Sequence, residues 1–251
     1  MTFKQGFAYW SMVEGRDPVP GLLEAAAEIG LTGVDFLPEE LWPQARAAGL
    51  ELVAIDGHWP LEVGFIDREN HARLGDDVRR ALQKAVDNGA HFVTVASGDR
   101  NEKTGDDALS ICVEGIAPLA QEAEQAGVTL LLEPLNTKVD HAGHECDTTA
   151  WAAEVVDRVG SAHLKILYDF YHAQIMEGDL VRTVEANLDR IGHLHTAGVP
   201  GRHELDDGQE INYRGVAGAL RRLGYSGYVV HEFLPTSDPI QGLKQAYAQF
   251  A

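Results

Sequence analysis

The sequence has few cysteines and no long apolar run. Cys112 and Cys146 are its two cysteines, and no C-x-x-C pair occurs. Two cysteines are too few for a disulfide scaffold, so nothing indicates an oxidising compartment. No run of about 18 apolar residues is present, as a membrane-spanning helix requires. The first residues, MTFKQGFAYWSM, also lack the basic and apolar parts of a secretion signal. We therefore expect a soluble cytoplasmic protein with no membrane partner.

Basic residues are scarce relative to acidic ones. The chain has 39 acidic and 20 basic residues, which give a formal net charge of −19. Such a surface repels the phosphate backbone of nucleic acids and anionic lipid, so partners of both classes are disfavoured. The simplest interpretation is a surface that favours solubility, because charge alone identifies no substrate.

The sequence also lacks the G-x-G-x-x-G turn that marks many open, doubly wound α/β sheets. Instead, short apolar runs alternate with helix-patterned segments, and no linker or break in composition divides residues 1–251. The apolar runs are continuous rather than alternating, which is typical of parallel strands buried on both faces. Eight segments are predicted as strands: 6–12, 33–37, 51–57, 91–97, 128–135, 164–170, 192–198 and 228–234.

The segments between these strands have helical patterns that end at glycine, as at Gly89, Gly127 and Gly160. Eight strand–helix units of about 31 residues suit right-handed βαβ crossovers. We therefore predict a single-domain (β/α)8 TIM barrel that spans residues 1–251. The irregular stretches 136–147 and 199–213 follow strands, so they would lie on the C-terminal face, where active sites of such barrels are built.

Each of the last four predicted strands carries a metal-binding type of side chain near its C-terminal end. The successive separations are 36, 26 and 37 residues, about one strand–helix unit each, so these side chains should converge over the barrel mouth. Carboxylates beside apolar residues are costly unless they are paired or metal-bound. A single one is more often a helix cap or an ion-pair partner, but four in register favour a site for one divalent ion, Mn, Mg, Co or Zn. The predicted ligands are Glu133, Asp169, His195 and Glu232.

Further polar and aromatic residues are candidates for substrate contacts. Asn136 follows Glu133 by three residues, and His172 follows Asp169 by three. Trp10 and Trp59 lie near the ends of the first and third predicted strands, where they either wall the pocket or pack under loops. His58 lies in the same region as Trp59 and is a further candidate, although the sequence does not settle its role.

Four stretches of the second half resemble one known family. The hydroxypyruvate isomerase branch of the xylose-isomerase-like barrels has similar motifs, and the superfamily also contains ketose 3-epimerases, inosose isomerases and endonuclease IV. The resemblance covers roughly residues 128–235, whereas the N-terminal half matches only in architecture. The stretches are LLEPLNTKVDHAG, YDFYHAQIMEGDL, GHLHTAGVPGRHELDDGQEINY and VVHEF.

The resemblance implies residue roles. The four predicted ligands fall on the family's metal ligands, and Glu133 and Glu232 also fall on its catalytic acid/base pair. His172 and Arg202 fall on substrate-binding positions. The chain departs from the family at His195, because many hydroxypyruvate isomerases have Gln there and the ketose 3-epimerases have His. This departure leaves the exact substrate open.

The residues themselves suit the same chemistry. Isomerising a hydroxy-aldehyde to a hydroxy-ketone, as between tartronate semialdehyde and hydroxypyruvate, needs removal of a proton next to the carbonyl and its return to the neighbouring carbon. A divalent metal bound by the carbonyl and hydroxyl oxygens lowers the cost of the ene-diolate intermediate. A carboxylate on each side of the substrate can move the protons, and Glu133 and Glu232 are the candidates. Arg202 would grip a substrate carboxylate bidentately, or it would merely order the 199–213 loop.

Other functions remain as alternatives. A ketose 3-epimerase or another sugar or inosose isomerase needs the same metal and the same glutamates. An endonuclease IV-like metallonuclease is disfavoured, because it needs several metals and a basic DNA groove. A non-catalytic sugar-binding barrel is disfavoured because all four ligands are present. The expected partner is a small hydroxy-carbonyl molecule, and the sequence leaves open whether the protein forms a homo-oligomer.

Overall fold

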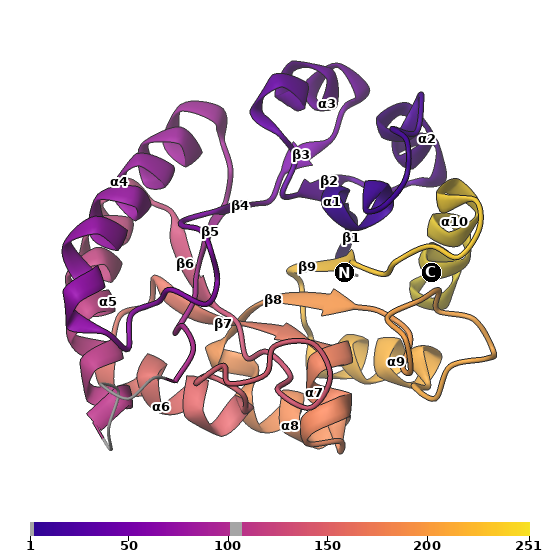
Figure 1. The fold of residues 1–251 in the computed structure, drawn as a ribbon. Helices are drawn as coiled ribbons and strands as arrows, with labels where there is room; N and C mark the ends of the chain where they lie inside the picture. Colours follow the sequence, from indigo (N-terminus) through magenta and orange to yellow (C-terminus); the bar gives the residue numbers. More distant parts are fainter. Residues whose placement is uncertain (1–2, 101–106) are drawn as a thin grey trace.

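In a computed structural model, which describes residues 3–100 and 107–251, parallel strands form a ring surrounded by helices (Figure 1). The strand order is β3-β2-β1-β9-β8-β7-β6-β5-β4, and every pairing is parallel. This architecture confirms the predicted TIM barrel. The strands are β1 (Lys4–Ala8), β2 (Gly33–Asp35), β3 (Glu51–Leu52), β4 (Ala54–Asp56), β5 (Phe92–Val95), β6 (Thr129–Leu132), β7 (Leu164–Asp169), β8 (Ile191–Thr196) and β9 (Tyr228–His231).

The two ends of the sheet meet at Val53. β3 pairs with β2, and β4 pairs with β5 on the other side. The Val53 amide donates to the Val34 carbonyl, and the Val53 carbonyl accepts from the amides of His91 and Phe92. The third predicted strand is therefore divided into β3 and β4, and it joins both edges of the sheet.

The longer helices form the outer layer of the barrel. In α4, Leu74, Val78 and Leu82 are buried at four-residue spacing, which places one apolar face against the sheet. The described helices are α1 (Tyr9–Val13), α2 (Leu22–Ile29), α3 (Trp42–Ala48), α4 (His71–Asn88), α5 (Ala108–Ala126), α6 (Thr149–Val159), α7 (Phe170–Met176), α8 (Leu180–Asn187), α9 (Tyr213–Leu223) and α10 (Pro239–Phe250). Single 3-10 turns lie at Glu39–Leu41, Arg68–Asn70 and Leu188–Arg190. No helix of the described residues is long and apolar enough to cross a membrane.

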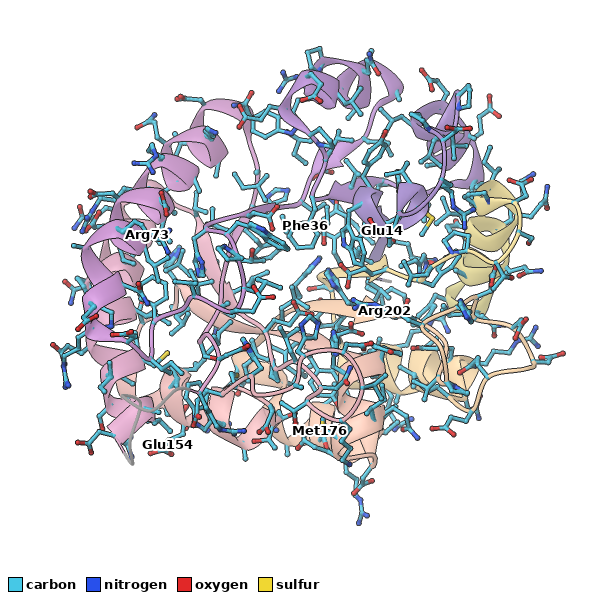
Figure 2. All side chains as sticks on the ribbon, in the orientation of Figure 1. Glu14, Phe36, Arg73, Glu154, Met176 and Arg202 are labelled. Atoms are coloured by element: carbon cyan, nitrogen blue, oxygen red, sulfur yellow. The ribbon has the colours of Figure 1, made fainter. Side chains whose placement is uncertain are left out.

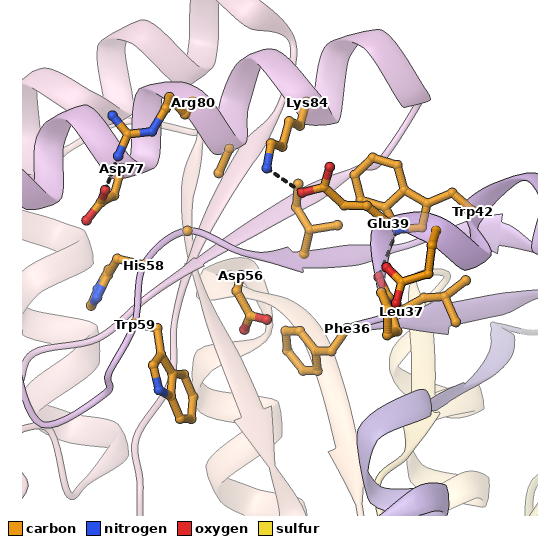
Figure 3. Close-up of a pocket in the computed structure, with 15 residues that line it drawn as sticks. Phe36, Leu37, Glu39, Trp42, Asp56, His58, Trp59, Asp77, Arg80 and Lys84 are labelled. Carbon is orange, nitrogen blue, oxygen red and sulfur yellow. Dashed lines mark hydrogen bonds and ion pairs between the residues drawn. The ribbon is translucent and has the colours of Figure 1, made fainter. Parts of the chain in front are cut away.

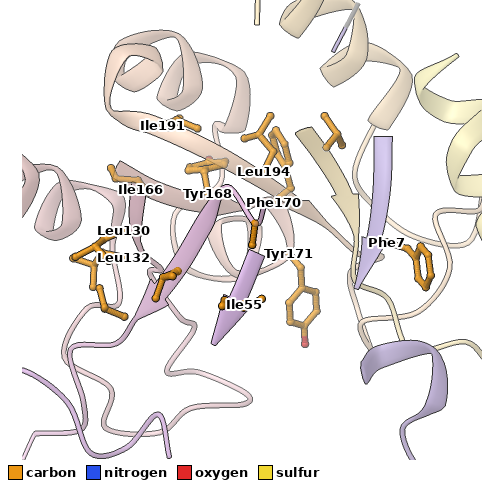
Figure 4. Close-up of a cluster of buried hydrophobic side chains, with 14 of the residues drawn as sticks. Phe7, Ile55, Leu130, Leu132, Ile166, Tyr168, Phe170, Tyr171, Ile191 and Leu194 are labelled. Atoms are coloured by element: carbon orange, nitrogen blue, oxygen red, sulfur yellow. The ribbon is translucent and has the colours of Figure 1, made fainter. Parts of the chain in front are cut away.

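The core lies between the strands and this outer layer. Leu130, Leu131 and Leu132 are consecutive in β6 and all fully buried, because both faces of the strand are covered. Figure 4 shows residues of β6, β7 and β8 gathered in one apolar cluster. This double burial explains why the strands appear in the sequence as continuous apolar runs.

The predicted strands extend too far at their C-terminal ends. The segment predicted at 6–12 leaves the sheet after Ala8, and Tyr9–Val13 forms the short helix α1, in which the Ser11 hydroxyl donates to the Ala8 carbonyl. β6 and β9 likewise end one residue before Glu133 and Glu232. Trp10 and Leu135 lie just beyond β1 and β6 and line a cavity instead of continuing the strands, so β propensity alone misplaces the boundary.

Candidate active site

The four predicted ligands come together at the C-terminal end of the barrel. Glu133 directly follows β6, Asp169 ends β7, His195 lies in β8, and Glu232 directly follows β9. Because these four strands are neighbours in the sheet, their side chains meet. One ligand atom from each residue lies within 4.8 Å of those of the other three. We call these four residues the ligand cluster.

The ligand cluster has more buried negative charge than its protein partners neutralise. Burial raises the pKa of Glu133 well above its usual range and that of Asp169 to about 6. The Glu133 Oε1 and Asp169 Oδ2 atoms have no hydrogen-bond partner among the described residues. These unpartnered carboxylate oxygens converge with one imidazole nitrogen. A hard divalent cation would coordinate such a group of atoms. The donor set therefore fits such an ion.

Arg202 lies beside the ligand cluster. Its Nη2 is 2.6 Å from Glu232 Oε2 and 3.6 Å from Asp169 Oδ2, and the side chain is 11% exposed. Burial opposes ionisation of Glu232, but His195 and this guanidinium outweigh it and lower the pKa of the carboxyl. The guanidinium also stacks on the rings of Trp10 and Tyr171. Figure 2 shows Arg202 at the open centre of the ring, where it lines a cavity.

His172 also lines this cavity, with its orientation set by Asn136. The Asn136 backbone amide and side-chain amide both approach His172 Nδ1, at 3.1 and 2.7 Å. Two donors at Nδ1 place the proton on Nε2, which lies 3.6 Å from Asp169 Oδ2. Burial lowers the pKa of His172 well below its usual range, so the ring is a neutral donor. Asn136 is fully buried and, unlike His172, does not line the cavity, so the structure places it behind His172.

Trp10 and His58 lie on the cavity wall. The Trp10 indole N–H donates to Glu232 Oε1 at 2.6 Å, so this residue also orients a carboxylate of the ligand cluster. His58 Nε2 accepts from the Ala96 amide at 3.0 Å. Burial, with a contribution from Arg73, lowers the pKa of His58 to about 4, so its imidazole is neutral.

Sequence reasoning missed Asp35, which lies directly behind His195. One oxygen, Asp35 Oδ2, is 2.7 Å from His193 Nε2 and 2.9 Å from His195 Nε2, and all three side chains are fully buried. An ionised carboxylate only accepts, and although burial opposes it, the two histidines hold the pKa of Asp35 below its usual value. Both Nε2 atoms therefore donate, and His195 presents Nδ1 to the ligand cluster. The three side chains are also close enough to hold an ion, but the distances are those of hydrogen bonds.

A prediction follows from this contact. Asp35→Asn should weaken metal binding about 10–100-fold, because a metal-ligating histidine depends on an acceptor for its other nitrogen. Calorimetric titration of the chelated protein with Mn measures the effect. Asp17→Asn, an exposed aspartate, is the matched control, and His193→Gln should lose less because the Asp35–His195 contact remains. Equal Mn affinity in folded Asp35→Asn and the native protein would contradict this role.

The ligand cluster opens into a cavity of about 380 Å³. Beside it lies a larger hollow of about 660 Å³, the outer hollow, which shares Phe36, Asp56, His58 and Trp59 with the first cavity (Figure 3). Asp56 was also missed from the sequence. The sequence feature that could have indicated Asp56 is its place at the C-terminal end of an apolar strand segment. The four predicted ligands share this feature, but Asp56 lies in the first half of the chain.

A family model of the xylose isomerase-like TIM barrel matches residues 6–249. The chain belongs to this family. Among curated relatives of this barrel family, hydroxypyruvate isomerase of Escherichia coli is 37% identical over 93% of this chain and 95% of its own. The 2-oxo-tetronate isomerase of Pectobacterium atrosepticum is 30% identical over 93% of each chain. These matches confirm the resemblance to the hydroxypyruvate isomerase branch, and the chain is an isomerase of that kind.

Solved structures share this xylose isomerase-like barrel. An AP endonuclease, family 2, from Brucella melitensis has a TM-score of 0.85 and 27% identity, with 96% of this chain and 97% of that chain covered. A 3-keto-D-glucoside 4-epimerase from E. coli has a TM-score of 0.81 and 22% identity, with 99% of each chain covered, and shows the common fold. The fold alone therefore accommodates several chemistries, and the side chains of the site must decide among them.

Proposed function

We propose that this protein is a metal-dependent isomerase that interconverts a small hydroxy-aldehyde and hydroxy-ketone, of the tartronate semialdehyde and hydroxypyruvate type, through an ene-diolate. One observation carries the proposal. The ligand atoms of Glu133, Asp169, His195 and Glu232 lie within 4.8 Å of one another at the end of the barrel where a cavity opens. The relatives named hydroxypyruvate isomerase and 2-oxo-tetronate isomerase support the substrate type.

The protein's own side chains have distinct parts in this reaction. A divalent cation held by the ligand cluster would supply stabilisation of the negative charge that develops on the substrate oxygens. Glu133 and Glu232, which also line the cavity, would remove a proton beside the carbonyl and return one to the neighbouring carbon. His172 Nε2–H would donate to a substrate oxygen, and Trp10 would hold the Glu232 carboxylate in place. Arg202 would bind the substrate carboxylate with its planar fork of donors.

A substrate panel tests this proposal. Chelated protein, and the same protein after Mn or Mg is restored, would be incubated with hydroxypyruvate, tartronate semialdehyde, 2-oxo-tetronate and ketoses, with proton NMR as the readout. We expect aldehyde–ketone interconversion in the restored protein. No turnover of any panel member after metal loading would contradict the proposal.

A ketose 3-epimerase is the second candidate. His195 favours it, because by resemblance the epimerases carry histidine at this position. The same NMR panel separates the two reactions, since epimerisation inverts one carbon and leaves the carbonyl where it was.

The Arg202 assignment gives a prediction of its own. Arg202→Lys should raise KM for hydroxypyruvate about tenfold, because a charged hydrogen bond is lost with the planar fork although the charge remains. A neutral substrate such as glyceraldehyde should show a smaller change in KM. Arg222→Lys, on the exposed face of α9, serves as the control. An unchanged KM for the best acidic substrate would reassign Arg202 to ordering the 199–213 loop.

A further inference from the structure

The cavity at the ligand cluster is larger than hydroxypyruvate requires. Its volume of about 380 Å³ lies in the range of pockets that bury drug-sized ligands, whereas hydroxypyruvate has three carbons. The outer hollow adds about 660 Å³. Because the two spaces share Phe36, Asp56, His58 and Trp59, a ligand bound at the ligand cluster can extend from one into the other.

Asp56 stands where the two spaces meet. It ends β4, and Figure 3 shows its carboxylate between the rings of Phe36 and Trp59. No hydrogen bond or ion pair joins it to another described residue, yet its side chain is accessible from the cavity. The surrounding walls, with the charges of Glu232 and Asp35, raise the pKa of Asp56 to about 6. An acceptor of this kind, with no protein partner, is available to a ligand.

Aromatic surface faces the same junction. Trp59 is 68% exposed, and Phe36 lies on the other side of Asp56. A carboxylate acceptor between two apolar rings suits a chain that has both hydroxyl and C–H surface, as a sugar acid does.

The charge of the outer hollow argues against an anionic group there. Carboxylates outnumber cations in its lining, and both cations are already paired, Lys84 with Glu39 and Arg80 with Asp77. A phosphate or a second carboxylate at the far end would therefore meet net negative charge. The charged residues that line the hollow are Glu39, Glu40, Asp56, Asp77, Arg80 and Lys84.

We propose that the substrate carries an uncharged hydroxylated chain longer than that of hydroxypyruvate, which runs from the ligand cluster past Asp56 toward Trp59. Asp56 accepts hydrogen bonds from its hydroxyls and so determines specificity. This inference rests on the proposed function for the bound head group, a hydroxy acid held by the ligand cluster and Arg202.

Binding of non-reacting hydroxy acids tests the inference without catalysis. Calorimetry with the Mn-restored protein would compare glycerate, erythronate, threonate and gluconate, which share a head group and differ in chain length or configuration. We expect at least one of the longer acids to bind about tenfold tighter than glycerate. Asp56→Ala and Asp56→Asn should remove this gain and leave the affinity for glycerate unchanged. Glu124→Gln, an exposed acid on α5, controls for the loss of one negative charge.

The outcomes separate this inference from the proposed function. Equal affinity for all chain lengths, or an equal loss for all acids in the Asp56 variants, would overturn it. Tighter binding of 3-phosphoglycerate than of glycerate would assign the outer hollow to an anion and would also overturn it. Length-dependent binding that is lost in the Asp56 variants, in a protein that turns over no panel substrate, would support the inference and contradict the proposed function.

Discussion

Removal of divalent cations by a chelator is expected to reduce turnover to the detection limit and to lower the melting temperature by roughly 5–10 °C. Turnover fails because charge on the substrate oxygens is no longer stabilised. Stability falls because Glu133, Asp169 and Glu232 are left as a buried group of carboxylates, for which the described residues supply only His195 and Arg202 as counter-charges. Elemental analysis, a thermal melt and the NMR assay, before and after Mn or Mg is restored, measure the three effects.

Asp169→Asn provides the internal comparison for this experiment. Its melting temperature should respond weakly to added Mn, whereas Glu124→Gln should respond as the native protein does. Full turnover in chelated protein with metal below background would refute the metal dependence. No stabilisation by Mn or Mg would refute the ligand cluster as their site.

Replacing either glutamate of the proposed proton-transfer pair by glutamine is expected to lower kcat by at least ~10²-fold, the usual scale of general acid–base catalysis. Glu133→Gln and Glu232→Gln preserve size and one oxygen ligand while they remove basicity. Metal occupancy, measured by elemental analysis on the same samples, should therefore fall much less than kcat. Glu124→Gln is again the matched control, with kcat unchanged.

Reaction in D2O sharpens the assignment of the two glutamates. Deuterium should enter the substrate at the carbon that receives the proton. If either variant retained full turnover, the assignment of both glutamates as proton-transfer groups would be refuted. A product free of deuterium in that variant would then indicate a hydride shift. A variant that loses its metal would be compared with Asp169→Asn, which removes a ligand but no base. Only a loss of kcat larger than that of Asp169→Asn would support a role in proton transfer.

The ligand cluster can be predicted from the sequence because its residues recur at a regular spacing. Four acidic or imidazole side chains recur at the ends of successive apolar runs, and a barrel places such positions side by side. His172 and Arg202 are found through motifs near these strands. The strand ends are less predictable, because an aromatic run such as Tyr9–Val13 suits a strand as well as a short helix.

Asp35 and Asp56 are less accessible to sequence reasoning. Each is a single acid at the end of a short strand in the first half of the chain, outside the four stretches whose motifs indicate the family, and a helix cap is the commoner explanation for such an acid. The role of Asp35 depends on its contact with His195, which lies 160 residues away in the sequence. Asp56 is a candidate for binding a ligand only because it lines two cavities. Cavities depend on how side chains pack, so the sequence does not indicate them.

The two halves of the chain contribute different residues to the site. The ligand cluster, His172 and Arg202 all follow β5, whereas Phe36, Asp56, His58 and Trp59, which wall the outer part of the cavity, precede it. We therefore expect substitutions between residues 36 and 62 to redirect substrate choice without changing either glutamate of the proposed proton-transfer pair. A lineage of such barrels can diversify by varying residues 36–62 while it inherits the second half. An engineer who seeks a new substrate should randomise residues 36–62 and leave the second half fixed, together with Trp10 and Asp35, which contact Glu232 and His195.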